Sequence, residues 1–99
     1  MSSESVTVPV PVSVATGAAA VVTNLREKAV QLSGTFSATI TIEVSLDGTN
    51  FSALTGAVDL TAPAVVAIPF LAVSVRADTT VYASGTPAAA VIGDNPRTN

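Results

Sequence analysis

Hydrophobic and polar residues alternate most regularly between Thr35 and Phe51, in the run TFSATITIEVSLDGTNF. One parity of this run carries the apolar residues Phe36, Ala38, Ile40, Ile42, Val44 and Leu46. Serine, threonine and glutamate occupy the other parity, and this period of two is expected of a half-buried β-strand. The run ends at Asp47-Gly48, a dipeptide that readily supplies the positive φ angles of a tight hairpin turn. The pattern predicts a long central strand, with Phe51 opening its return partner.

The segment from Ser5 to Val14, SVTVPVPVSV, also alternates. Its apolar parity consists only of valines, Val6, Val8, Val10, Val12 and Val14. Pro9 and Pro11 lie on the opposite parity, and proline has no N–H to donate to a β-ladder. The segment is therefore predicted to be either a sheet edge protected by proline or an extended arm. In the arm interpretation the five valines bind a neighbouring subunit.

Shorter apolar runs separated by Gly or Pro predict the other strands. These runs cover 18–23, 26–33, 51–54, 64–70, 71–77, 81–83 and 88–92, with 57–60 as strand or loop. Within 26–33, Val30 and Leu32 are expected to point inward, whereas Arg26 and Lys28 mark an exposed strand start. Pro69 indicates that 64–70 is an edge strand. Turns are predicted at 78–80 and 84–87.

Short strands at roughly ten-residue spacing are typical of sandwiches and barrels. We therefore expect an all-β fold, a single small β-sandwich or jelly-roll-like domain of about seven to eight short antiparallel strands. The expected divisions are the arm or edge strand at 1–16, the sandwich at 17–93 and a polar tail at 94–99.

The composition points toward association with other proteins. Charged residues make up only 11% of the chain, against about 25% in ordinary soluble domains, so part of the surface is expected to be covered by partners. The net charge of −3 and the scatter of the four basic residues argue against nucleic-acid binding, which needs several cations on one face. The N-terminus lacks the basic and apolar regions of a secretory signal, and no apolar run is long enough to span a membrane.

The chain offers little catalytic chemistry. It contains no histidine and no cysteine, the commonest general base and a common nucleophile. Glu43 and Arg76 are predicted to form an ion pair across two strands. Loop oxygens of the kind that binds Ca²⁺ come from Asp47, Asn50, Asp59, Asp78 and Asp94, without the spacing of an EF-hand loop. We therefore expect a protein that is not an enzyme and needs no cofactor or metal.

The run VQLSGTFSATITIEVSLDGTNF, residues 30–51, resembles a pattern in small virion proteins of tailed bacteriophages. In those proteins a run of the form LxGtfsaTvxiExSxDGxnW precedes a later VR strand and an sGxP segment. Here the counterparts are Val75-Arg76 and 84–87, so the resemblance covers residues 30–92. Phe51 stands where the pattern usually has tryptophan, which keeps an aromatic ring for packing but loses a hydrogen-bond donor.

The resemblance implies a β-sandwich subunit of a phage particle without catalytic residues. It favours a capsid decoration, or cement, protein that forms a homo-oligomer, most simply a trimer, and binds the major capsid protein in the virion. Two alternatives stay open. One is a structural component of the phage tail or neck with the same fold, and the other is a carbohydrate-binding or host-adhesion module.

Overall fold

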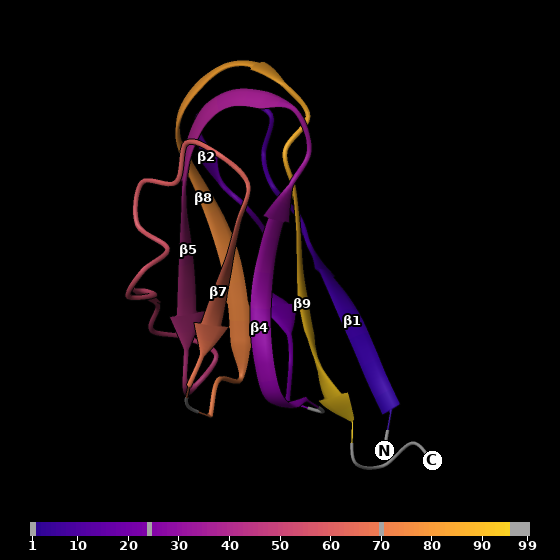
Figure 1. Cartoon of the computed structure of the whole chain (residues 1–99). Coiled ribbons are helices and arrows are strands. Elements are labelled where there is room, and N and C mark those ends of the chain that lie inside the picture. Colours follow the sequence, from indigo (N-terminus) through magenta and orange to yellow (C-terminus); the bar gives the residue numbers. More distant parts are fainter. Residues whose placement is uncertain (1, 24, 70, 96–99) are drawn as a thin grey trace.

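The computed structural model describes residues 2–23, 25–69 and 71–95, which form two facing antiparallel sheets and no helix (Figure 1). The four-stranded sheet has the order β1 (Ser2–Val8), β9 (Ala88–Asn95), β4 (Arg26–Ser33) and β7 (Ala64–Ile68). The five-stranded sheet has the order β2 (Ala15–Thr16), β8 (Ser74–Gly85), β5 (Phe36–Ser45) and β6 (Ser52–Ala53), and β3 (Ala20–Val21) also pairs with β8. The prediction of an all-β fold consistent with a small sandwich is confirmed.

One long antiparallel ribbon runs through the centre of both sheets. Its first arm is β4 followed by β5, and its second arm is β8 followed by β9. The pairing continues across the step between the sheets, because Ser33 lies opposite Ala88 and Phe36 opposite Gly85. Figure 1 shows the two arms arching over together at the top of the molecule. The sandwich is therefore a two-stranded ribbon folded onto itself, with shorter strands added at its edges.

Two glycines make this fold of the ribbon sterically feasible. Gly34 has φ of 98° and Gly85 has φ of 95°, values that L-residues with a side chain rarely adopt. A Cβ on Gly34 would lie closer than 3.0 Å to the carbonyl oxygen of Thr86, and one on Gly85 would meet the backbone of Thr35 in the same way. The backbone N–H of Thr86 donates to the carbonyl oxygen of Thr35 at 2.9 Å, so the ladder is kept within the bend.

The core lies between the two halves of the ribbon. The predicted inward parity of β5 is confirmed from Ala38 to Val44, with Ile40 and Ile42 completely buried, whereas Leu46 is exposed beyond the end of the strand. Val30 and Leu32 point inward from β4, as predicted. A valine- and alanine-rich interior of this kind buries little area per residue, so close packing of the two sheets has to supply the stability.

The predicted turn at 78–80 is wrong, because β8 runs without interruption from Ser74 to Gly85. Thr79 is fully buried, and its hydroxyl donates to the carbonyl oxygen of Pro11 at 2.9 Å. A polar Asp-Thr-Thr sequence thus remains in a central strand because its buried hydroxyl finds an acceptor. Register shifts between β5 and β8 accommodate the strand's length.

The N-terminal segment is an edge strand that ends early. Strand β1 stops at Val8, and the chain then crosses to the other sheet, where β2 pairs with β8. Val8 is buried, and Val6 and Val10 pack against the core, so the arm hypothesis does not fit these three valines. Val12 and Val14 remain exposed. The chain's own core covers three of the five valines that were expected to reach a neighbour.

Other strand limits also differ from the sequence prediction. The apolar run 18–23 contributes only the two residues of β3, and 57–60 forms an isolated bridge between Leu60 and Ile40 rather than a strand. Strand β7 is an edge strand next to Pro69, as predicted, and Phe70 lies outside the described residues. Strand β9 extends to Asn95, into the predicted tail, because its end pairs with β1; residues 96–99 lie outside the described residues.

Candidate interaction surface

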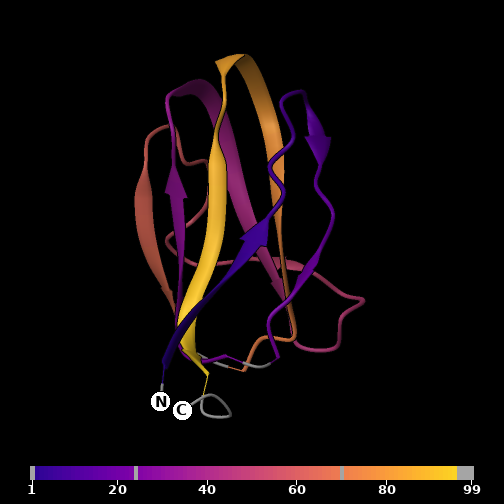
Figure 2. The same cartoon turned by 90° about the vertical axis from the view of Figure 1, so that its right-hand side faces the viewer.

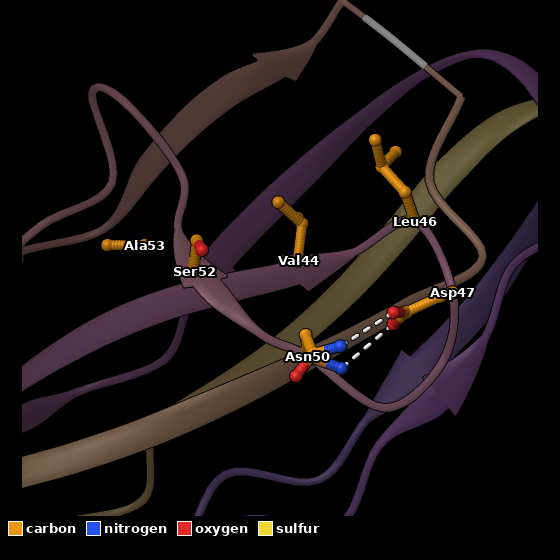
Figure 3. Close-up of a pocket in the computed structure, with 6 residues that line it drawn as sticks. All are labelled: Val44, Leu46, Asp47, Asn50, Ser52 and Ala53. Carbon is orange, nitrogen blue, oxygen red and sulfur yellow. Dashed lines mark hydrogen bonds between the residues drawn. The ribbon is translucent and has the colours of Figure 1, made fainter.

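A hydrogen-bonded turn follows the central strand at the end of the sandwich opposite the ribbon's bend. The backbone N–H groups of Thr49 and of Asn50 each donate to Oδ1 of Asp47 at 2.8 Å, and Nδ2 of Asn50 donates to Oδ2 of Asp47 at 2.7 Å (Figure 3). The hydroxyl of the buried Ser45 donates to Asp47 and accepts from the N–H of Gly48. The predicted turn role of Asp47 and Gly48 thus has a definite hydrogen-bond basis, in a loop longer than a two-residue hairpin.

These hydrogen bonds favour the ionised form of Asp47. The backbone N–H of Asn50, then that of Thr49, and then side-chain donors hold the pKa of the carboxyl well below its usual range. The carboxylate is fully committed to donors within its own loop, because both oxygens accept hydrogen bonds there. The turn that follows Leu46 is therefore held together by its own hydrogen bonds.

Glu43 and Arg76 lie directly opposite each other on β5 and β8, and the predicted ion pair is present. Nε of Arg76 lies 2.6 Å from Oε1 of Glu43. The guanidinium also covers the ring of Phe51 at 4.1 Å from its centroid, a cation–π contact. Phe51, the aromatic residue of the motif, therefore lies on the outer face of the sheet, directly before β6. Its ring is covered by the Arg76 guanidinium.

Exposed leucines stand on the same end of the molecule as the turn. Leu46 is 65% exposed and Leu71 is 86% exposed. Both line a shallow depression of about 490 Å³, together with Thr23, Leu25, Lys28, Ala72 and Val73. Leu46 also lines a second depression of about 450 Å³ beside the Asp47 turn and the start of β6 (Figure 3). We call Leu46, Leu71 and these two depressions the leucine end of the sandwich.

Lys28 lies beneath the leucine end, contrary to the prediction that it marks an exposed strand start. Its side chain shares the inward face of β4 with Val30, and only 7% of the residue is exposed. Nζ donates to the carbonyl oxygen of Leu25 at 3.1 Å. Burial lowers the pKa of the Lys28 amine below its ordinary value, since desolvation disfavours the charged form. Arg26, two residues earlier, is exposed, and a register shift between β4 and β9 separates it from the regular ladder.

The oxygens considered for Ca²⁺ do not meet in one place. Asp47 and Asn50 bond to each other, Asp59 donates its N–H to the hydroxyl of Thr41, and Asp78 accepts from Thr16. Across 2–23, 25–69 and 71–95, no three acidic, histidine or cysteine side chains are grouped as they would be around a metal ion. The sequence had placed these residues in loops but carried no information on their distances.

Sequence reasoning missed the leucine end. Leu46 continues the apolar parity of β5 and Leu71 belongs to the apolar face of the run 71–77, so neither was predicted to stand at an exposed surface. The available signal was position, because Leu46 directly precedes the turn dipeptide and Leu71 lies two residues beyond Pro69. Side chains at such ends project past the core.

Comparisons with known proteins place the chain in no group. No protein-family model, curated protein or solved structure matches it. The part of the chain that the structure describes holds no helix with the length and apolarity needed to cross a bilayer. The functional interpretation therefore depends on the surface itself and on the sequence pattern of residues 30–92.

Proposed function

We propose that this chain is a structural protein of a bacteriophage particle that decorates the capsid and stabilises the shell by binding between capsid subunits. The proposal combines two sources of support. The resemblance of residues 30–92 to small virion proteins supports the class of protein, a virion subunit. The leucine end supports the binding step, because it offers an exposed apolar surface.

The observation that carries the binding step is the exposure of Leu46 and Leu71 around one depression. Large apolar side chains that stand together at a surface favour contact with a partner, because covering them removes their apolar area from water. The hydrogen-bonded Asp47 turn holds Leu46 in place before binding, so little conformational entropy is lost when the partner docks. The occupant of this surface is the major capsid protein.

Binding between capsid subunits would stabilise the shell by mass action, because a ligand that prefers the assembled state shifts the equilibrium toward it. Each contact can be weak, since the stabilisation of the shell adds up over many bound copies. A decoration protein of this kind needs no catalytic residue. It needs a rigid fold and an exposed apolar contact.

The first experiment is quantitative mass spectrometry of purified particles of a phage that encodes the chain, scaled to the major capsid protein. Hundreds of copies per particle support decoration of the shell. A few to a few dozen copies assign the chain to the tail or neck instead and overturn decoration. Absence from the particle overturns both virion roles and favours the carbohydrate-binding module, which a glycan array then tests.

The second experiment locates the contact. Particles lacking the chain are mixed with purified protein, and the bound fraction is measured by cosedimentation. Leu46→Ser with Leu71→Ser is expected to weaken binding at least about tenfold, since two leucines lose their buried area. Val58→Ser is the matched control, because Val58 is an exposed loop residue, 51% accessible, outside the leucine end. Equal binding by both variants would remove the leucine end from the contact.

A further inference from the structure

Strand β7 forms one of the two edges of the four-stranded sheet. Within the described residues β7 pairs only with β4, and Figure 2 shows β7 at the outer edge of the molecule, at the left. In an antiparallel ladder, alternate residues turn their N–H and C=O groups to opposite sides. About half of the β7 residues therefore point these groups away from β4, as a template for another strand.

No charged side chain along this edge repels a second copy of the chain. Residues 60–75 contain no charged side chain, although the chain as a whole carries a net charge of −3. Natural edge strands are commonly protected by short length, by proline, by lysine, by an inward-pointing charge or by a bulge. Strand β7 reads Ala-Val-Val-Ala-Ile and has none of the charges. The opposite edge of the same sheet, β1, carries the carboxylate of Glu4.

Two prolines favour one register of pairing. Pro63 and Pro69 stand at equal distances on either side of Val66. If two β7 strands pair antiparallel about a two-fold axis at Val66, Pro63 of each copy lies opposite Pro69 of the other. Because proline donates no N–H, the ladder would end at both prolines and use all of Ala64–Ile68 between them.

This register also keeps the two cores on the same side. Val65 and Ala67 point to the outer face of the sheet, whereas Ile68 is buried. Pairing about Val66 places Val65 of one copy opposite Ala67 of the other, so outer faces meet outer faces. A shift by one residue would set the outer face of one copy against the core face of the other.

We propose that two copies of this chain associate through their β7 edges, in the register centred on Val66, to form a continuous eight-stranded sheet. The contact is isologous, as the two-fold axis requires. A pair of five-residue strands is smaller than the interface of a permanent dimer. The dimer is therefore expected to dissociate on dilution and to gain strength where many copies are held on one surface. The inference does not depend on the proposed function.

The first test is sedimentation velocity of the purified full chain over a concentration series. A monomer–dimer equilibrium supports the proposal, whereas a monomer at all concentrations up to about 1 mM overturns it. A trimer, which the virion resemblance favours, also overturns two-fold pairing through β7 while leaving capsid decoration open. Failure of the dimer and failure of the capsid proposal are therefore distinguishable.

Two double variants test the register. Val65→Lys with Ala67→Lys places a lysine opposite a lysine at both outer-face pairs, and we expect the dissociation constant to rise at least about tenfold. Val65→Glu with Ala67→Lys places glutamate opposite lysine at the same pairs and is expected to keep the wild-type constant within about threefold. The lysine pair also brings the net charge closer to zero, so a weaker dimer could not come from overall repulsion. Equal effects of the two variants overturn the register.

Hydrogen exchange provides a readout that does not depend on the variants folding. In the wild-type chain, the outward amides of 64–68 are expected to exchange more slowly as the concentration rises through the dimer range. The amides of β1 at the opposite edge serve as the internal control and should not change. Concentration-independent exchange in β7 would overturn edge pairing.

Discussion

Replacing Gly85 with alanine should destabilise the fold strongly, because this glycine sits where the ribbon crosses from one sheet to the other. Its φ of 95° lies in a region that L side chains rarely adopt. The added Cβ would also lie under 3.0 Å from the backbone of Thr35 and Phe36. Neither atom group can move aside without opening the ladder between β5 and β8.

The magnitude follows from two costs. A residue with a side chain at such a φ costs about 1–3 kcal/mol, and relief of a backbone clash costs further packing and hydrogen bonding. We expect a loss of at least about 3 kcal/mol, out of the roughly 5–15 kcal/mol that stabilises a typical domain. For a domain of this size that corresponds to a Tm lower by about 12 °C or more.

Gly48→Ala is the matched control. Gly48 also has a positive φ, 82°, but the nearest atom to an added Cβ is Cγ1 of Val73 at 3.8 Å, an ordinary contact. Only the conformational cost of about 1–3 kcal/mol applies, which lowers Tm by at least about 4 °C. The difference between the two alanine variants therefore isolates the close approach of the two ribbon arms.

The assay is reversible thermal unfolding followed by circular dichroism, with urea unfolding as a second measure of the free energy. The reasoning would be refuted by a Gly85→Ala variant that melts within a few degrees of Gly48→Ala. Such a result would mean that the two arms are not held close at the bend.

Three further predictions concern charged side chains. Because the folded-state pKa of Asp47 is depressed, its ionised carboxylate stabilises the fold above about pH 4, and this stabilisation is lost as the pH falls below that value. The free energy of unfolding of Asp47→Asn, measured by urea unfolding, should therefore fall less steeply with acidification than that of the wild type. Because the folded-state pKa of Lys28 is depressed, the unfolded chain binds more protons in the alkaline range just below the ordinary lysine pKa. Stability should therefore rise with pH there in the wild type and stay flat in Lys28→Met, as measured by urea unfolding at several pH values. A double-mutant cycle with Glu43→Gln and Arg76→Met should give a coupling of at most about 1 kcal/mol, since both side chains are partly exposed; a coupling above about 2 kcal/mol would contradict this.

The sequence predicted the elements whose pattern is local. Strand β5 and its buried face follow from strict alternation, and β4 and the edge position of β7 follow from parity and Pro69. The pairing of Glu43 with Arg76 was also predictable, because both lie on the outer parity of apolar strands. In each case the residues next to it in the sequence are enough to predict the position of the side chain.

The features that sequence reasoning missed depend on partners distant in the chain. Asp78-Thr79-Thr80 reads as a turn, but Pro11 supplies an acceptor to the hydroxyl of Thr79 and keeps β8 continuous. Lys28 reads as exposed, but it is buried and its amine donates to the carbonyl oxygen of Leu25. The folding of the ribbon at Gly34 and Gly85 could not be read from either glycine alone, since it requires that the two lie side by side.

The folded ribbon also determines the order in which contacts can form. Its paired residues are nearest in sequence at Ser45 and Ser74, and their separation grows steadily to Arg26 and Asp94. The entropic cost of closing the loop between Ser45 and Ser74 has to be met before any ribbon contact is gained. Once that loop closes, pairing can proceed residue by residue through one sheet, around the bend and into the other. We therefore expect slow folding for the chain's length, one kinetic phase, and two sheets that never form independently of each other.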